Sequence, residues 1–258
     1  MIAIIAAMEQ EIEILRSHMA VRDTRTLAGQ TYWAGTLAGT EAVLALCGIG
    51  KVNAAVGTAF MIDRFRPEAL INTGSAGGLG PAQSCGDIVL STALRHHDVD
   101  VTAFGYEPGQ VPKLPPAFEA DVQLLEVAEA AAKSLAEQGV LPASLSVHRG
   151  EIGSGDQFVH DPDHISVIRS RFPGLRAVEM EGAPVAQVCF QMHVPFLVVR
   201  ALSDIAGKES PMLFNEFLPL AARHSSALVM EMLKSWKSVP VSKAGGSIDN
   251  AADEVSVQ

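Results

Sequence analysis

Apolar and polar positions follow one another along the chain in blocks that predict alternating strands and helices. Residues 1–8, MIAIIAAM, form a short continuous apolar run that is typical of a buried strand. Directly after it, Ile12, Leu15 and Met19 recur at the spacing of one helix face. Further helices are predicted at 51–65, about 121–138, a segment ending at 168, 182–192 and about 213–237. Further strands are predicted at 31–39, 41–50, 68–78, 86–100, about 144–150, 175–180 and 195–204.

This succession predicts a single α/β domain over residues 1–238, with a mixed, mainly parallel central sheet flanked by helices on both faces. An antiparallel pair is expected at 31–50, with a turn at Gly39-Thr40. The strand at 68–78 is expected to end in a glycine-rich turn, and residues 104–118 are expected to form an irregular loop because glycine and proline interrupt them. Residues 239–258 are polar without apolar periodicity, which predicts a mobile C-terminal tail.

Composition narrows the class of protein. A chain of 258 residues that is 48% hydrophobic can bury a large core, and its net charge of −10 argues against nucleic acid or an anionic membrane as partner. The three cysteines are far apart in the sequence, which favours a reducing compartment. The N-terminal apolar run is much shorter than the roughly 20 residues that a membrane span needs. We therefore expect a soluble cytoplasmic protein.

Polar side chains stand where four predicted strands end: Glu11, Ser75, Glu181 and Asp204. Ligands of open α/β sheets bind outside the carboxyl ends of the strands, and a buried carboxylate is costly unless it is paired or used. Each acid taken alone is compatible with a solvated helix cap. Three acids at strand ends favour a functional site. In an extended strand, Glu179 and Glu181 would share one side, and Glu179 is expected to have a structural or supporting role.

Cofactor and metal motifs are incomplete. GSAGGLG at 74–80 lacks the dinucleotide spacing, and GIGKV at 48–52 lacks the first glycine and the hydroxyl residue of a phosphate loop. His96 and His97 are adjacent and would point to opposite faces of a strand, with no second cluster of ligands. The sequence therefore predicts neither a cofactor nor a metal. The glycines at Gly77 and Gly78 would still let a ligand approach the backbone.

Eight segments in register resemble the 5′-methylthioadenosine/S-adenosylhomocysteine nucleosidases of the nucleoside phosphorylase superfamily. The resemblance runs from about residue 1 to 237 and rests on AAMEQEI, CGIGKVNAA, INTGSAGGL, GDIVLS, HDVDVTAFGYEPGQ, SGDQFV, AVEMEGAPVAQVC and VPFLVVRALSD. It implies hydrolysis of the N-glycosidic bond of an adenine nucleoside thioether, as part of methionine salvage, with release of adenine. A nucleoside phosphorylase-like fold is implied with it.

The resemblance also implies roles for individual residues. Glu11 would activate the attacking water, Asp204 would protonate N7 of the purine, and Glu181 would hold the ribose 2′ and 3′ hydroxyls. For Asp204 to donate a proton near pH 7, its pKa must lie above the ordinary value of about 3.9, and apolar neighbours would raise it. Substrate contacts are implied for Met8, Ile49, Ser75, Gly77, Phe158, Val159, Val178, Met180, Ser203 and Phe214.

The loop DVTAFGYEPGQVP resembles a family segment that crosses a dimer interface. On that reading Phe104 and Pro112 complete the site of the partner in a homodimer, while Val101 and Phe214 line the thioalkyl channel of their own chain. An ordinary surface loop is the alternative.

Hydrolysis and phosphorolysis are the main alternatives within the superfamily. Phosphorylases typically place an arginine shortly before the glycine-serine turn, where this chain has Asn72, although Arg200 remains as a possible cation. A phosphate anion would be repelled beside Glu11, whereas neutral water would not. The sequence thus favours a hydrolase. Open alternatives are a phosphate-dependent purine nucleoside phosphorylase, an aminodeoxyfutalosine nucleosidase and a nucleoside-binding module without catalysis.

Overall fold

The structure, a computed structural model, describes residues 1–206 and 210–236. Its strands are β1 (Ile2–Ala6), β2 (Ala20–Leu27), β3 (Gln30–Leu37), β4 (Thr40–Leu46), β5 (Ala69–Gly78), β6 (Ile88–His96), β7 (Phe118–Glu119), β8 (Val147–Ser154), β9 (Leu175–Glu179) and β10 (Phe196–Ile205). Its helices are α1 (Glu9–Ser17), α2 (Lys51–Phe65), α3 (Val122–Glu137), α4 (Pro162–Arg171), α5 (Gly182–Gln191) and α6 (Ser210–Ser235), with a short 3₁₀ helix η1 (Thr102–Phe104).

Four neighbouring strands, in the order β4, β1, β5 and β10, run parallel through the centre of the molecule. Ile4 pairs with Leu44 on one side and with Ile71 on the other, and Leu197 extends the row beside Ile71. All four side chains are fully buried. Continuous apolar strands of this kind need cover on both faces, so their composition already requires two layers of helix.

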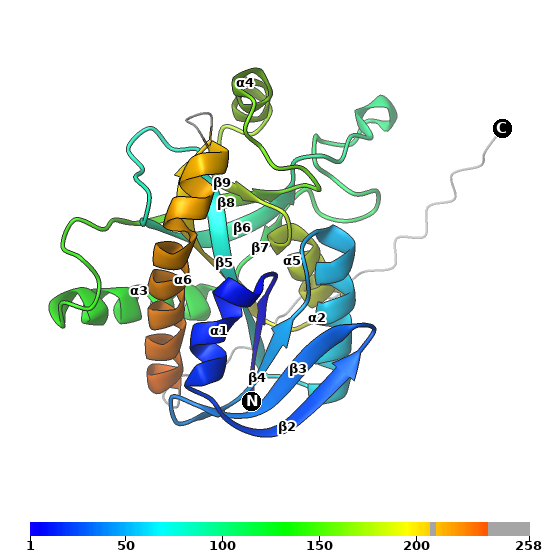
Figure 1. Ribbon diagram of the computed structural model, residues 1–258. Coiled ribbons are helices and arrows are strands. Elements are labelled where there is room, and N and C mark those ends of the chain that lie inside the picture. The colour runs from blue at the N-terminus through cyan, green and yellow to red at the C-terminus, as the bar shows by residue number, and fades with distance from the viewer. Residues whose placement is uncertain (207–209, 237–258) are drawn as a thin grey trace.

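Helices provide that cover (Figure 1). Helix α6 packs on β5 and β10 and contacts α1 and α3 on one side of the sheet, whereas α2 and α5 pack against each other on the opposite side. The α/β fold with a mixed sheet and helices on both faces is therefore confirmed. Each central strand consequently ends in a segment that emerges between two helical layers.

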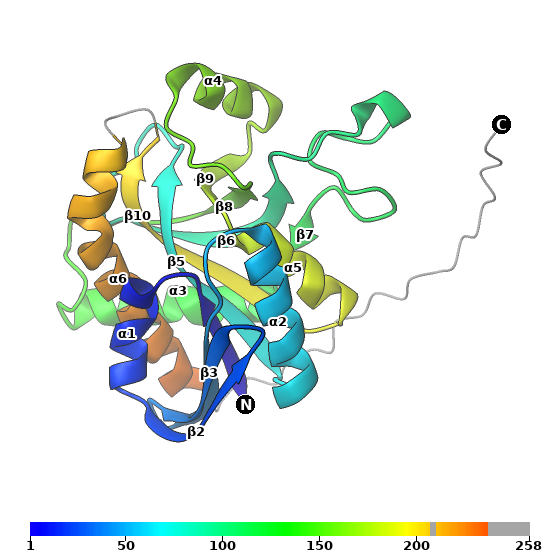
Figure 2. The same ribbon diagram turned by 45° about the vertical axis from the view of Figure 1, so that its right-hand side comes forward.

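Part of the sheet closes on itself, which the sequence did not predict. Strand β10 pairs with both β5 and β6, β6 pairs with β8, β8 with β9, and β9 returns to β5. The ring contains antiparallel contacts at β6–β10 and at β5–β9, and it lies beside the open part formed by β1 to β4 (Figure 2). Because β5 belongs to both parts, its end lies at the centre of the molecule.

Local comparison with the sequence pattern gives three corrections. The segment 74–78 is not a turn but the last part of β5, paired with β10 on one side and with β9 at its end. The hairpin turn lies at Ala38-Gly39, one residue earlier than predicted, and both residues have positive φ, 49° and 78°. Strand β2 was not predicted because its side chains are almost all exposed and show no alternation.

Some expectations concern residues that the structure does not describe. The predicted tail, 239–258, and Lys237 at the end of the predicted last helix lie outside them. Within residues 1–206 and 210–236, no helix has the length and apolar content of a membrane span. In the same part of the chain, no three His, Cys, Asp or Glu side chains are grouped so that they could hold a metal ion.

Candidate active site

Strands β1, β5 and β10 end side by side and deliver polar groups to one place. Met8, the N-cap of α1, and Glu11, in the first turn of that helix, follow β1. Ser75 lies in β5, and Asp204 lies near the end of β10. The fourth group, Glu181, comes from another direction, because β9 runs antiparallel to β5 and ends at Glu179. The expected parity of Glu179 and Glu181 on one extended strand is therefore wrong, since Glu181 is already the N-cap of α5.

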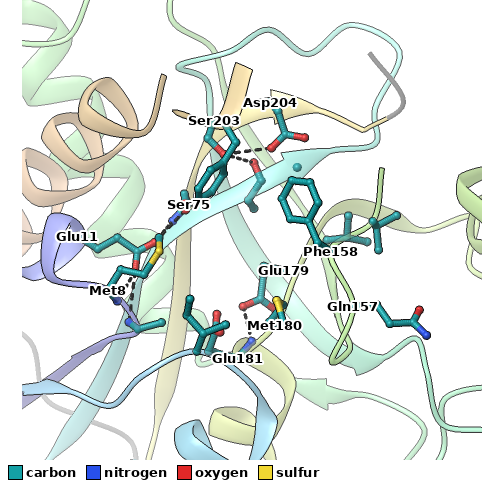
Figure 3. Close-up of a pocket in the computed structure, with 17 residues that line it drawn as sticks. Met8, Glu11, Ser75, Gln157, Phe158, Glu179, Met180, Glu181, Ser203 and Asp204 are labelled. Carbon is teal, nitrogen blue, oxygen red and sulfur yellow. Dashed lines mark hydrogen bonds between the residues drawn. The ribbon is translucent and has the colours of Figure 1, made fainter. Parts of the chain in front are cut away.

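These groups surround a cavity of about 320 Å³ (Figure 3). Of the residues that the resemblance assigned to the substrate site of this chain, all but Val101 line it: Met8, Glu11, Ile49, Ser75, Gly77, Phe158, Val159, Val178, Met180, Glu181, Ser203, Asp204 and Phe214. The cavity also contacts Ala7, Ala76, Gln157 and Glu179, which sequence reasoning did not select as contacts. Ala7 and Ala76 carry no chemical signal in a sequence, because small apolar residues are common throughout the core.

Glu11 is fixed by four hydrogen bonds. The backbone N–H groups of Ala7 and Met8 donate to Oε2 at 3.2 and 3.1 Å, and the backbone N–H and the hydroxyl of Ser75 donate to Oε1, both at 2.9 Å. Glu11 occupies the third position of α1 and reaches back to its N-cap, Met8, as in one half of a capping box. The helix start and β5 thus hold this buried carboxylate in one orientation at the cavity wall.

A β-bulge directs Asp204 into the cavity. Leu202 pairs with Ala76 but Asp204 pairs with Gly77, so Ser203 is an extra residue in β10. Without the bulge, alternation would send Asp204 to the same face as Leu202. With it, Asp204 shares the face of Ser75 and Gly77. The Ser203 hydroxyl donates to Oδ1 of Asp204 at 3.1 Å, and both side chains are buried.

Glu179 is the centre of a buried polar network. Arg200 donates to its Oε2 at 2.5 Å and to Oδ1 of Asn72 at 2.6 Å. The backbone N–H groups of Glu181 and Gly182 also donate to Oε2 of Glu179, at 2.9 and 2.8 Å, and the Ser154 hydroxyl donates to its Oε1. Burial opposes ionisation of Glu179, but Arg200 and these donors hold its pKa below the ordinary value. The structural or supporting role of Glu179 stays a prediction, and its side chain also lines the cavity.

Glu181 has the opposite electrostatic environment. Its Oε1 accepts a hydrogen bond from the backbone N–H of Gly50 at 2.8 Å. Burial, followed by the negative charge of Glu179, raises the pKa of Glu181 to about 8. Two glutamates separated by one residue therefore differ in protonation because only Glu179 contacts the guanidinium of Arg200 directly. Near neutral pH, Glu181 therefore retains its proton at the cavity wall, whereas Glu179 is ionised.

The other part of the cavity wall is aromatic and apolar. Phe158 contacts Phe214 edge to face, with ring centroids 5.9 Å apart, and stacks near His160 at 6.1 Å. Val159 and Val178 are buried beside them, while Phe158 itself is 45% exposed. Figure 3 shows the Phe158 ring near the centre of the site, with Asp204 and Glu181 on different sides of the space around it. An aromatic face of this kind suits a flat heterocycle.

Three residues expected near the thioalkyl end do not line the cavity of this chain. Phe104 and Pro112 are in the segment between β6 and β7, and Phe104 is 82% exposed at the end of η1. Val101, expected in the channel of its own chain, is also absent from the described cavity lining. That segment projects from the body of the molecule in both ribbon views (Figures 1 and 2).

The fold and the cavity at its strand ends define an α/β protein with a carboxylate-lined pocket that has an aromatic wall. A family model described as the phosphorylase superfamily matches residues 1–234. A 5′-methylthioadenosine/S-adenosylhomocysteine nucleosidase of Anoxybacillus flavithermus is 52% identical over 90% of this chain and 97% of its own. The chain belongs to the phosphorylase superfamily and, within it, to the family of these nucleosidases.

Solved structures agree with this assignment. The nucleosidase of Neisseria meningitidis in complex with methylthio-immucillin-A is 48% identical, with a TM-score of 0.86 over 91% of this chain and 98% of that one. A futalosine hydrolase of Helicobacter pylori is 33% identical, with a TM-score of 0.83 over 91% of this chain and 97% of that one. The family resemblance inferred from the sequence is thereby confirmed.

Replacing Glu181 by glutamine is expected to stabilise the protein at alkaline pH. The folded state retains the Glu181 proton between the ordinary pKa of 4.5 and about 8, where the unfolded chain has lost it. The wild type therefore loses stability as pH rises through this window, and Glu181→Gln does not. Thermal unfolding should give the variant a higher Tm at pH 8 than the wild type, and the difference should shrink toward pH 5. A difference independent of pH would contradict this electrostatic account.

Proposed function

We propose that the protein hydrolyses the N-glycosidic bond of 5′-methylthioadenosine and S-adenosylhomocysteine, and also that of 5′-deoxyadenosine. The products are adenine and the 5-substituted ribose, which places the reaction in methionine salvage. The observation that carries the proposal is the arrangement of Glu11, Glu181 and Asp204 around one cavity that also contains an aromatic face. No cofactor takes part in this reaction scheme.

In the proposed mechanism, Asp204 acts on the leaving group. Adenine leaves poorly as an anion, so a proton delivered to N7 makes it a neutral molecule while the C–N bond breaks. Asp204 is buried and is oriented by the Ser203 hydroxyl, whose oxygen lies 3.1 Å from its Oδ1. Phe158 would stack on the base, and Val159 would offer its backbone groups to the base edge.

Glu11 would act on the opposite side of the sugar. Cleavage leaves positive charge on the ribose ring, and a water oriented by Glu11 adds to C1′ as its proton passes to the carboxylate. An acid and a base on opposite sides of a bond, with room for a water, resemble the arrangement of inverting glycosidases. Four hydrogen bonds preorganise Glu11, so little rearrangement is needed as charge develops.

Glu181 would hold the ribose. An ionised carboxylate can accept hydrogen bonds from the adjacent 2′ and 3′ hydroxyls, and Met180 beside it would pack against the ring. Burial and the charge of Glu179 raise the pKa of Glu181 to about 8. Hydrogen bonds to the charged form lower the pKa of a carboxyl group, so bound ribose should help to ionise Glu181.

Hydrolysis is favoured over phosphorolysis because Arg200, the possible cation for a phosphate, is bound to other residues of the chain. Arg200 is 1% exposed and donates to Asn72 and Glu179, so it is not available to a phosphate ion. Among the described residues that line the cavity there is no Lys, Arg or His, while four are carboxylates. A divalent anion beside Glu11 would therefore find no cationic partner among these residues, whereas neutral water needs none.

A homodimer is also proposed. Phe104 is 82% exposed on a segment that projects from the molecule, and Ile49 at the cavity wall is 51% exposed. Large exposed apolar side chains near a site favour a protein interface. In the dimer, Phe104 and Pro112 of each chain would complete the thioalkyl pocket of the partner, with Val101 beside the channel of its own chain.

The proposed location is the cytoplasm. Cys47, Cys85 and Cys189 are free, and Cys47 and Cys189 are buried. Burial, with a contribution from Glu181, raises the pKa of Cys47 to about 12 and keeps it a thiol. Free thiols are typical of proteins from reducing compartments.

An aminodeoxyfutalosine nucleosidase is the second candidate. It is favoured by one observation, the 33% identity to the futalosine hydrolase of Helicobacter pylori over 97% of that chain. The two candidates share the adenine and ribose contacts and differ in the group on the 5′ carbon. Parallel assays with both nucleosides decide between them.

The first test is adenine release from methylthioadenosine in phosphate-free buffer. Release is expected at full rate, and addition of phosphate should leave the rate unchanged and should yield no ribose 1-phosphate product. S-adenosylhomocysteine, 5′-deoxyadenosine and aminodeoxyfutalosine are assayed beside it. Turnover that depends on added phosphate would assign the protein to the phosphorylases instead, and tight binding without turnover would mark a nucleoside-binding module.

The second test separates the roles of the carboxylates. Asp204→Asn and Glu11→Gln should each lower kcat by at least about 100-fold, because a proton donor or acceptor in the transition state is lost. Binding of the nucleoside should change little. Glu181→Gln should weaken nucleoside binding as well as turnover, but should leave the affinity for free adenine unchanged. Near-normal turnover in Asp204→Asn would remove it from the role of proton donor.

The third test is complementation between two variants. Asp204→Asn alone should be inactive, and Phe104→Ala alone should show a raised KM. When the two chains are coexpressed, mixed dimers form. The Phe104→Ala chain retains Asp204 and receives Phe104 from the Asp204→Asn chain, so one site in each mixed dimer is complete. Activity at low substrate concentration should then exceed the sum of the activities of the separate variants. The control is a chain that carries both substitutions and is expressed alone. It should show no activity above that of Asp204→Asn. Monomers in sedimentation, with no gain on coexpression, would contradict the shared site.

A further inference from the structure

The Gly-Lys sequence at the start of α2, which resembles part of a phosphate loop, binds two carboxylates of its own chain. The backbone N–H of Gly50 donates to Glu181 at 2.8 Å, and that of Lys51 donates to Oδ1 of Asp156 at 2.7 Å. Gly50 has φ of 99°, in the left-handed region, and a Cβ at this position would lie 3.1 Å from Oδ1 of Asp156. The helix start therefore requires glycine, for both its conformation and the closeness of Asp156.

Asp98 completes the contact. The Nζ of Lys51 lies 2.7 Å from Oδ1 of Asp98, and the backbone N–H of Asp156 donates to Oδ2 of Asp98 at 3.0 Å. The ion pair is largely covered, with side-chain exposures of 21% for Lys51 and 16% for Asp98. Three segments are thereby joined: the start of α2, the end of β6 and the loop after β8. We refer to Lys51, Asp98 and Asp156 as the Lys51 clamp.

The clamp lies between two parts of the cavity wall. Asp156 directly precedes Gln157, Phe158 and Val159, which line the cavity. One residue before Lys51, Gly50 holds Glu181, and Ile49 also lines the cavity. Two successive backbone N–H groups therefore bind Glu181 and Asp156. The start of α2 thus sets the position of the cavity wall at Phe158 relative to the cavity wall at Glu181.

We propose that Asp156 is a positioning residue for nucleoside recognition. By accepting from Lys51 and donating to Asp98, it fixes the 156–159 loop against α2, so that the Phe158 ring stands at the correct distance from Glu181. This inference rests on the proposed function, in which Phe158 contacts the base and Glu181 the ribose. Asp156 acts only through the loop and is not itself among the cavity-lining residues.

A purely structural role is the alternative, because Asp156 satisfies an otherwise free N–H group at a helix N-terminus, and such caps stabilise proteins in general. The matched control is Asp121, the N-cap of α3, whose Oδ1 accepts from the backbone N–H of Leu124 at 2.9 Å. Asp121 does not line the cavity. Loss of either cap should lower Tm, but only loss of Asp156 should move the loop that carries Phe158.

The experiment compares Asp156→Ala, Asp156→Asn and Asp121→Ala with the wild type. For Asp156→Ala we expect a KM for methylthioadenosine about tenfold higher with kcat changed less than about threefold, because loop contacts serve ground and transition state alike. The dissociation constant of adenine should rise in parallel. Asp156→Asn keeps an oxygen that can accept from Lys51 and should recover most of the affinity. Asp121→Ala should keep wild-type KM and adenine affinity despite its lower Tm.

Unchanged KM and adenine affinity in Asp156→Ala would overturn the proposal, as would an equal change in Asp121→Ala. If Asp156→Ala does not fold, Asp98→Asn, which weakens the ion pair to Lys51, should raise KM in the same direction, and an unchanged KM there would overturn it too. A wild type that neither binds nor releases adenine would instead refute the proposed function. The two failures are thus distinguishable.

Discussion

The buried ion pair between Arg200 and Glu179 is the contact on which the arrangement of the cavity depends. Arg200 lies in β10 and Glu179 at the end of β9, and these two strands flank β5 in opposite directions. Asn72 of β5 completes the junction by accepting from Arg200 at 2.6 Å. Since Glu179 also accepts from the first N–H groups of α5, its position fixes where Glu181 begins that helix. Removal of one partner of such a pair leaves an uncompensated buried charge.

The same pair sets the electrostatic character of the site. Arg200 donates to Glu179 directly, and among the described residues that line the cavity there is no Lys, Arg or His. Burial first, and then the charge of Glu179, raises the pKa of Glu181 to about 8. A cavity lined by acids, with no cationic side chain among its described lining residues, is unfavourable for an anion but favourable for a reaction that develops positive charge. In the proposed mechanism, the oxocarbenium-like sugar and the protonated base are such a state.

The chain sequence was sufficient to predict the acids but not the way in which the fold presents them. Strand ends could be read from apolar runs, which selected Glu11, Glu181 and Asp204, and the family resemblance then supplied the role of each acid. The bulge at Ser203 leaves no trace in the apolar pattern, yet it decides the face on which Asp204 lies. The antiparallel course of β9 depends on pairing with β5, far away in sequence. Asp156 was missed for a similar reason: its partner, Lys51, is 105 positions away.

The glycine-rich end of β5 illustrates why a local pattern can be misinterpreted. Glycines at 74–78 resemble a turn, but the strand continues because both its edges are paired. Their function is spatial: a Cβ on Gly74 would lie 2.8 Å from Oε1 of Glu11, and one on Gly77 would lie 3.2 Å from Oδ2 of Asp204. Side chains at these positions would displace the two carboxylates. Because Gly74 and Gly77 lack side chains, the carboxylates of Glu11 and Asp204 can lie close to the backbone of β5. Between these two glycines, Ser75 contributes a hydroxyl.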